Sequence, residues 1–377
     1  MEFASRLDGV ADSATLRYSA LAKKPGVINL TIGRPDFDTP KVVKEAAKKA
    51  LDDGRVHYIP ARGIPELCEK IAQKLQVENG IKNLDKDRVI VSVGAKQILF
   101  ELFFALVDKN DVVTLPNPSW VSYEPMVQMC DGKIDWLPLK AENGFIPDET
   151  FLSKLENSKA KILAINSPNN PTGAVYPEKI LVKIVDICAK KGITLISDEC
   201  YEKIIYEGKH FSPASIYEKT VTVSAFSKEF SMTGWRLGYA ACSDKEVIEK
   251  MNLIQEQSVS SATSFAEYGA LACFTPEAAE MTKRMVAEFR KRRDYSMERL
   301  QKMGILCVKP SGAFYVFPKF GGDDFKLADK LLQNGVGVVP GSPFGSNGKG
   351  CVRISYGSAN LENLKTGFDR IEKTISG

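Results

Sequence analysis

The feature that most constrains the fold of this chain is an alternation of short apolar segments with helical segments, beginning near residue 40. The apolar segments are nearly continuous and rich in Val and Ile, which is typical of strands buried on both faces. Such strands, when separated by helices, form a mainly parallel sheet covered by helices on both sides. The sequence therefore predicts an α/β fold with a seven-stranded, mainly parallel sheet, formed by residues 88–93, 112–115, 134–139, 161–165, 193–197, 221–224 and 238–242.

Helix signals lie before and between these strands. Thr39 followed by Pro40 is a helix start, because a capping residue precedes a proline suited to the first helical position, and Gly54 ends that helix. Further helices are expected at residues 66–77, 96–107 and 180–191. Since the apolar residues of 96–107 lie on more than one side, we expect that helix to be well buried.

The pattern changes after about residue 260. Residues 265–303 are largely helical, and their charged stretch from Glu288 to Arg293 is expected to form a solvated helix face. Three strand candidates and a final helix from about residue 360 follow, the strands being residues 312–317, 336–339 and 351–356. We therefore predict a large domain of residues 41–279 and a smaller α+β domain made of residues 1–40 and 280–377.

Composition excludes several classes of function. The net charge of +4 comes from interspersed acids and bases, without a basic block that would indicate nucleic acid or a membrane surface. No apolar run approaches the ~20 residues of a membrane span, and the N-terminus lacks a signal pattern, so a cytoplasmic protein is expected. The eight cysteines contain no CxxC pair and only His57 and His210 are histidines, so no metal site is predicted.

The segment from Ser227 to Leu237 carries a lysine and an arginine eight residues apart, Lys228 and Arg236. A lysine held among apolar groups loses its proton more easily and can attack a carbonyl. A nearby arginine offers a two-pronged donor to a phosphate. These are the groups that pyridoxal 5'-phosphate (PLP) requires, although a surface lysine and arginine are the alternative if the segment is taken alone.

Two turns could contact such a cofactor. Residues 93–97 lie at a strand-to-helix junction, where the amides near Gly94 and Ala95 could bind phosphate, or could form only a tight turn. Residues 166–173 contain two X-Pro steps, which hold Asn170 in a fixed loop after a strand. An asparagine there could donate to a phenolate-like oxygen, or the segment could be an ordinary loop.

Asp198 and Tyr201 follow the strand at residues 193–197. Ligands of open α/β sheets gather at the carboxyl ends of strands. A carboxylate at that edge could keep a pyridinium nitrogen protonated, which makes the ring an electron sink. Tyr201 could donate to the same oxygen as Asn170, whereas a helix cap is the alternative role for Asp198.

Trp120 and Arg353 complete the candidate residues. Trp120 follows a strand and could stack on a flat cofactor ring or pack in the core. Arg353 lies inside an apolar strand, where a charge is costly unless it is paired. A substrate carboxylate could pair with it, as could a structural salt bridge.

Taken together and in this order, these residues resemble the class I and II aminotransferases, PLP enzymes of fold type I with a seven-stranded sheet in a large domain beside a smaller domain. The resemblance covers essentially the whole chain. Its motifs are Ile32 to Phe37, Tyr58 to Gly63, Gly94 to Lys96, Asn170 to Gly173, Asp198 to Tyr201, Lys228, Arg236, Gly312 to Tyr315, and Arg353. One departure is Ala225, since many relatives carry a serine that touches the phosphate three residues before the lysine.

The resemblance implies a role for each of these positions. Lys228 would bind PLP covalently and act in catalysis with Asp198, which would pair with the ring nitrogen. The other cofactor contacts that it implies are Gly94, Ala95, Lys96 and Arg236 at the phosphate, Asn170 and Tyr201 at the ring oxygen, Trp120 on the ring, and Tyr58 from a neighbouring subunit. The substrate contacts that it implies are Arg353 and Gly33 at the α-carboxylate, with Lys96, Trp120, Asn170 and Thr15.

The role implied for Tyr58 means a homodimer with shared active sites. Residues 94–100, 120–123 and 13–15 are similar to the prokaryotic aspartate aminotransferase subgroup, in which the matching lysine contacts the distal carboxylate of acidic substrates. The resemblance thus implies ping-pong transfer of an amino group between aspartate or glutamate and a 2-oxo acid such as 2-oxoglutarate.

Alternatives stay open at this point. Related enzymes with similar motifs are aromatic, prephenate or broad-specificity aminotransferases, and others of the same fold are PLP-dependent lyases that cleave C–S bonds. A transcription regulator with an aminotransferase-like domain would need a DNA-binding module, and the roughly 40 residues before the predicted large domain carry no basic cluster.

Overall fold

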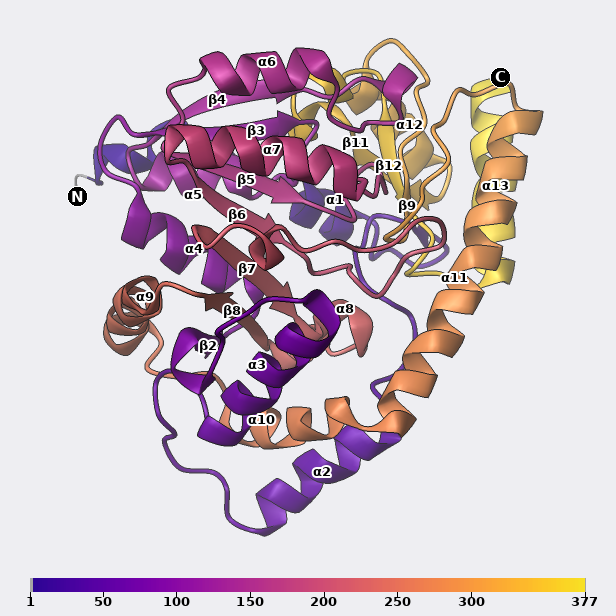
Figure 1. Cartoon of the computed structure of the whole chain (residues 1–377). Helices are drawn as coiled ribbons and strands as arrows, with labels where there is room; N and C mark the ends of the chain where they lie inside the picture. Colours follow the sequence, from indigo (N-terminus) through magenta and orange to yellow (C-terminus); the bar gives the residue numbers. More distant parts are fainter. Residues whose placement is uncertain (1–2, 377) are drawn as a thin grey trace.

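The computed structural model describes residues 3–376, and its centre is a seven-stranded sheet (Figure 1). The strands lie across the sheet in the order β2, β8, β7, β6, β5, β3, β4. Neighbours from β7 to β4 are parallel, whereas β8 is antiparallel to both β7 and β2. The strands are β2 (Val89–Ser92), β3 (Val112–Asn117), β4 (Lys133–Pro138), β5 (Ile162–Asn166), β6 (Thr194–Asp198), β7 (Thr220–Ala225) and β8 (Gly238–Cys242).

Helices cover both faces of this sheet, because side chains along each strand alternate between the faces. In β5, Ile162 and Ala164 pack in one core cluster with Leu99, while Leu163 and Ile165 pack in another with residues of α7. The helices over the first face are α4 (Ala95–Leu106), α5 (Tyr123–Met129) and α9 (Lys245–Ser258). Those over the second face are α3 (Pro65–Asn79), α6 (Glu149–Asn157) and α7 (Glu178–Lys191).

Two small sheets lie beside the large one. Strands β1 (Ile28–Asn29) and β10 (Val336–Gly337) form a parallel pair. Strand β12 (Val352–Ser355) is flanked by β11 (Val339–Pro340) and β9 (Tyr315–Val316), both antiparallel to it. The helices that complete the fold are α1 (Ala14–Leu21), α2 (Lys41–Asp52), α8 (Phe226–Glu229), α10 (Ser264–Ala270), α11 (Pro276–Lys302), α12 (Asp324–Gln333) and α13 (Leu361–Ser376).

Helix α11 is 27 residues long and runs along one side of the molecule, from α2 and α10 to α13 (Figure 1). The expectation that its charged stretch 288–293 is a solvated face is wrong for two residues. Arg292 and Arg293 are 4% and 2% exposed. Arg292 pairs with Asp36 at 2.8 Å and Arg293 with Glu207 at 3.1 Å, so that partners from other segments compensate the buried charges.

The predicted α/β architecture with a seven-stranded, mainly parallel sheet is confirmed. The small sheets differ more from expectation: the predicted strand 312–317 is only β9, and the predicted strand 336–339 is divided between β10 and β11. Its two halves pair with different partners, β1 and β12. The predicted domain boundaries remain a prediction, and residues 1, 2 and 377 of the smaller domain lie outside the described residues.

Within residues 3–376, no helix is both long enough and apolar enough to cross a membrane. The eight cysteines are all free thiols.

Candidate active site

The predicted site residues come from loops at one edge of the sheet. Strands β3, β5, β6 and β7 are parallel, so their carboxyl ends lie at the same edge. Asn166 and Asp198, the last residues of β5 and β6, are register partners. The segments that follow these strands carry Trp120, Asn170, Tyr201 and Lys228, which is the location expected for a ligand site in an α/β sheet.

Lys228 lies on α8, directly after β7, and is partly buried. Its Nζ donates a hydrogen bond to the backbone oxygen of Gly33 at 2.5 Å. Burial lowers the pKa of Lys228 to about 8, and the positive charges of Arg353 and Arg236 act in the same direction. A substantial fraction of the amine is therefore unprotonated and nucleophilic at neutral to mildly basic pH.

Asp198 is 6% exposed at the end of β6. Its Oδ2 accepts a hydrogen bond from the Tyr123 hydroxyl at 2.6 Å, and its Oδ1 accepts one from the Cys200 amide at 3.2 Å. Burial raises the pKa of Asp198, and no ion pair within 4.0 Å involves this carboxylate among residues 3–376. A cationic ring nitrogen would supply the missing counter-charge.

Tyr123 was not predicted as a site residue. It lies at the start of α5, in the segment that also carries Trp120, and packs edge-on against that tryptophan with ring centroids 5.2 Å apart. The signals in the sequence were its position after β3 and its place in residues 120–123, which resemble the aspartate aminotransferase subgroup. Nothing in a tyrosine alone predicts a bond to Asp198, 75 residues away.

Arg353 in β12 is 1% exposed, and within the described chain it has no carboxylate within ion-pair distance. Its Nη1 donates to Asn170 Oδ1 at 3.0 Å and its Nη2 donates to the Thr31 oxygen at 2.6 Å, while Nε has no hydrogen-bond partner. The alternative of a structural salt bridge therefore does not hold. A buried cation with neutral neighbours and an unpaired donor is suited to an anionic ligand.

Tyr201 and Tyr315 contact each other, and the Tyr315 ring lies next to Arg353. Their hydroxyl oxygens are 2.8 Å apart, and both side chains are buried. A Cβ atom placed on Gly33 would lie 2.4 Å from the Tyr315 hydroxyl oxygen, so a residue with a side chain could not replace Gly33 without a rearrangement. The glycine thus lets the backbone approach the site closely.

The N-terminus of α4 forms a cradle that fits a phosphate. Gly94 caps this helix with φ of +87°, and a Cβ there would lie 2.6 Å from Arg236 Nη2. Arg236 donates to the Val93 and Thr233 oxygens at 3.2 and 2.9 Å, which holds its guanidinium beside the helix end. The amides of Ala95 and Lys96 belong to the first turn, where helix geometry provides no acceptor.

Lys96 and Trp120 lie together at the same helix end. The Lys96 Nζ is 5.2 Å from the centroid of the Trp120 ring. Burial, followed by the neighbouring charge of Arg236, lowers the pKa of Lys96. The pair thus offers a cation beside a flat apolar surface.

Two predicted residues are outside this network. Tyr58 is 95% exposed, and within residues 3–376 its side chain forms no hydrogen bond with the other candidates. Thr15 lies on α1, and its buried hydroxyl lacks a hydrogen-bond partner in the described structure. Ala225 is the last residue of β7, and its flanking residues Ser224 and Ser227 are buried.

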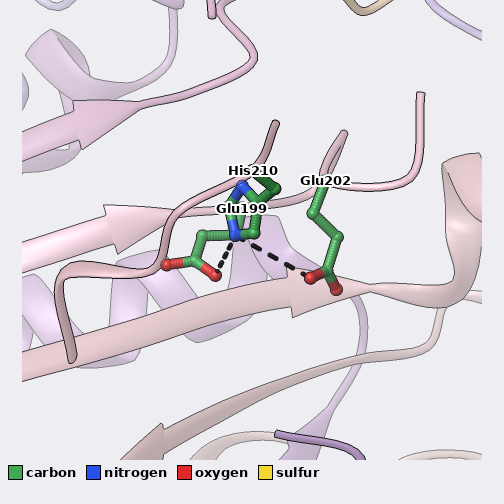
Figure 2. A group of neighbouring side chains, drawn as sticks. All are labelled: Glu199, Glu202 and His210. Atoms are coloured by element: carbon green, nitrogen blue, oxygen red, sulfur yellow. Dashed lines mark hydrogen bonds and ion pairs between the residues drawn. The ribbon is translucent and has the colours of Figure 1, made fainter. Parts of the chain in front are cut away.

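Glu199, Glu202 and His210 form a cluster whose atoms are close enough to bind a metal (Figure 2). Their oxygens are, however, already used. Glu199 accepts from Ser197, Ser212, Asn79 and His210, and Glu202 accepts from Lys74 and Asn79. The cluster is therefore a polar network whose carboxylates already have hydrogen-bond donors, and these bonds connect α3 to the loop after β6.

Known proteins match this chain in sequence and in fold. The family model for aminotransferase class I and II matches residues 25–371. The chain belongs to the class I and II aminotransferases.

The relatives of this aminotransferase extend over its whole length. A probable aspartate/prephenate aminotransferase of Aquifex aeolicus is 44% identical, with 99% of this chain and 98% of the relative covered. An aspartate/prephenate aminotransferase of Thermus thermophilus is 42% identical, with 98% of each covered. The solved structure of the Thermus thermophilus aspartate aminotransferase with maleate superposes with a TM-score of 0.95 at 40% identity, covering 99% of this chain and 100% of that one.

Proposed function

We propose that this aminotransferase uses PLP to move an amino group between a dicarboxylic amino acid, aspartate or glutamate, and a 2-oxo acid such as 2-oxoglutarate. The observation that carries the proposal is Arg353, a buried cation without a protein counter-ion at the strand edge that also holds Lys228 and Asp198. An α-carboxylate would supply the anion that this arginine lacks.

The donors and acceptors of the site fit PLP. The amides of Ala95 and Lys96, with Arg236, would hold the phosphate at the cradle formed by Gly94. Asp198 would pair with the ring nitrogen, because it is a buried carboxylate that lacks a cation. Asn170 and Tyr201 would bind the ring oxygen, and Trp120 would lie on the ring.

Bound PLP supplies a carbonyl carbon that takes the amino group and a protonated ring that withdraws electrons. Lys228 would provide the amine that holds the cofactor and then move a proton at the substrate α-carbon, for which a pKa of about 8 is suitable. Arg353 would orient the substrate through its α-carboxylate, helped by the close backbone of Gly33. Asp198 would keep the ring nitrogen protonated throughout.

The preference for acidic substrates rests on Lys96. Its ammonium lies beside Trp120 and could pair with a distal carboxylate, over which the segment around Thr15 would close. The structural relative from Thermus thermophilus was solved with maleate, a dicarboxylate, which supports this substrate class. Prephenate is a second candidate acceptor, because the names of both sequence relatives include it.

The test is a set of half-reactions without a second substrate. PLP-loaded enzyme is mixed separately with aspartate, glutamate, phenylalanine, alanine and kynurenine, and conversion of the visible band to the near-ultraviolet band of the aminated cofactor is followed. Aspartate and glutamate should convert fastest, and prephenate or 2-oxoglutarate should reverse the change. Release of pyruvate and ammonia from a cysteine conjugate would instead indicate a lyase.

The Lys228→Ala variant is the matched control. It should bind PLP without the covalent linkage, so that borohydride no longer fixes the cofactor to the protein, and lose about 10³-fold or more in kcat. Retention of most of the turnover would remove Lys228 from the mechanism.

We further propose that two copies form a homodimer in which Tyr58 reaches the phosphate of the neighbouring subunit. Its 95% exposure supports this assignment, because the side chain is free to contact a second subunit. We also retain the division into a large domain of residues 41–279 and a smaller domain of residues 1–40 and 280–377 as a proposal.

A further inference from the structure

Tyr315 connects three parts of the site that come from distant segments of the chain. It lies in β9, where it pairs in register with Ser355 of the strand that carries Arg353. Its ring centroid is 4.6 Å from the guanidinium carbon of Arg353, and its hydroxyl is 2.8 Å from that of Tyr201. One side chain therefore touches both the carboxylate-binding arginine and the tyrosine at the ring oxygen.

The bond between the two hydroxyls can have either direction. A tyrosine hydroxyl has one hydrogen and two lone pairs. If Tyr201 donates to Tyr315, its only hydrogen is used and none remains for a ligand. If Tyr315 donates, Tyr201 accepts that bond and still has its own hydrogen to give.

The surroundings favour donation by Tyr315. Both residues are buried, and burial raises the pKa of each hydroxyl. The positive charge of Arg353 lies against the Tyr315 ring. It partly offsets the rise that burial causes in the pKa of Tyr315. Burial raises the pKa of Tyr201 well above its usual value, and the neighbouring Tyr315 acts in the same direction. The Arg353 guanidinium, 4.6 Å from the Tyr315 ring centroid, draws electron density from that ring, and this geometry makes the Tyr315 hydroxyl the better donor.

We propose that Tyr315 is a positioning residue that donates its hydrogen to Tyr201 and thereby reserves the Tyr201 hydrogen for the ring oxygen of the bound cofactor. The inference rests on the proposed function, since the ligand is PLP. When a hydroxyl accepts one hydrogen bond, the hydrogen bond that it donates becomes stronger, because the hydroxyl is polarised. Tyr315 thus acts on the cofactor through Tyr201 rather than by contact.

The test is the pH titration of the visible absorption band of PLP bound to the resting enzyme. A hydrogen bond to the ring oxygen stabilises the deprotonated form of the bound cofactor, so weakening that bond raises the apparent pKa of the band. The Tyr315→Phe variant retains the ring against Arg353 but loses the hydroxyl. We expect the apparent pKa to rise by about 0.5 units, while KM for aspartate changes less than about twofold because the ring remains.

A double-mutant cycle separates this role from general damage. Tyr201→Phe should raise the apparent pKa by more than Tyr315→Phe, and the double variant should match Tyr201→Phe alone, because Tyr315 acts through Tyr201. Tyr356→Phe is the matched control: it removes another buried hydroxyl, bonded to Tyr206 and Ala313 outside the site, and should leave the titration unchanged.

The sign of the shift decides the outcome. A fall of the apparent pKa in Tyr315→Phe means that Tyr201 was the donor, and an unchanged value in a folded variant means that the hydroxyl only packs; either result overturns the inference. Failure of the proposed function is distinguishable, because wild-type protein separated from free PLP would then retain no visible band.

Discussion

At the scale of single residues, reactivity follows from where charges are buried. Lys228 has a pKa of about 8 because burial disfavours its protonated form and two arginines repel it. In cofactor-free protein, labelling of Lys228 by an acylating reagent should increase with pH and reach half its maximum near pH 8. Exposed lysines should do so near pH 10. Mass spectrometry of peptides would report each lysine separately.

The Arg353→Met variant provides a control for this cause. Loss of the positive charge should move the Lys228 midpoint to higher pH, and loss of the Arg353 donors should leave the exposed lysines unaffected. A Lys228 midpoint near 10 in the wild type would contradict the burial argument.

Substrate choice is a second prediction at this scale. Lys96→Glu should lower kcat/KM for aspartate by about 10–100-fold more than for phenylalanine, the range of a charge-assisted hydrogen bond. Steady-state kinetics with both amino acids, at matched 2-oxoglutarate, measure the ratio. Lys96→Met removes the charge without reversing it and should give a smaller change in the same direction. Equal losses for both substrates would exclude Lys96 from specificity.

The residue roles that motifs could predict are those with a characteristic neighbour in sequence. Lys228 with Arg236, and Asn170 in its proline-rich loop, belong to this group, and the structure places each of them at the strand edge. Tyr123 and Tyr315 lie in motifs of the family resemblance, but their bonds to Asp198 and Tyr201 could not be predicted, because these contacts form only when segments 75 and 114 residues apart converge. Hydroxyl bonds of this kind depend on the fold and leave no local pattern.

At the scale of elements, prediction was accurate where burial is continuous. The strands of the large sheet are apolar on both faces, so their positions could be predicted to within a few residues. The short strands β9, β10 and β11 have two residues each, which is too few for a periodic pattern. Helix α11 shows a further limit, since the partners that bury Arg292 and Arg293, Asp36 and Glu207, are far away in sequence.

Helix α4 contains a buried carboxyl group whose effect on the free energy of unfolding can be measured. Glu101 on this helix is fully buried, and its Oε2 has no hydrogen-bond partner in the described chain. Burial raises its pKa to about 7, above the unfolded value of roughly 4.3. Because the pKa of Glu101 is raised in the folded state, its protonated side chain makes its full contribution to the free energy of unfolding below the unfolded pKa. That contribution is lost as pH rises towards 7.

Glu101→Gln removes this titration while keeping an oxygen for the donors Ser92 and Gln97. The variant should gain free energy of unfolding relative to wild type as pH rises from about 4.5 to 7, reaching on the order of 3 kcal/mol. Urea denaturation of both proteins at pH 5 and pH 8 measures the difference. An equal difference at the two pH values would show that Glu101 does not titrate in this range.

At the scale of the whole molecule, the proposed dimer predicts complementation between two defective proteins. Lys228→Ala lacks the amine, and Tyr58→Ala lacks the proposed contact to the neighbouring phosphate. In a mixed dimer, one site would carry both defects and the other neither. Co-refolded variants should therefore recover up to about half of the wild-type activity per mixed dimer, since one of two sites is intact.

If Tyr58 instead served its own chain, each site of a mixed dimer would carry one defect, and mixing would restore nothing. Activity at subsaturating PLP, with the mixed species separated by two affinity tags, distinguishes the two cases. Each variant refolded alone is the control.

Helix α11 is long and is tied by ion pairs to other segments of the chain, which limits how the parts of the molecule can move. Its 27 residues span about 40 Å. In its C-terminal half, Arg292 pairs with Asp36, and Arg293 pairs with Glu207 and donates to the Pro310 oxygen. If the small sheets rotated against the large sheet, helix α11 would have to bend or to tilt with them. Asp36, the partner of Arg292, is three residues from Gly33, whose backbone oxygen accepts the hydrogen bond of Lys228. A shift of α11 that carries residues 33–36 with it would therefore also change the contact, and with it the pKa, of the reactive amine.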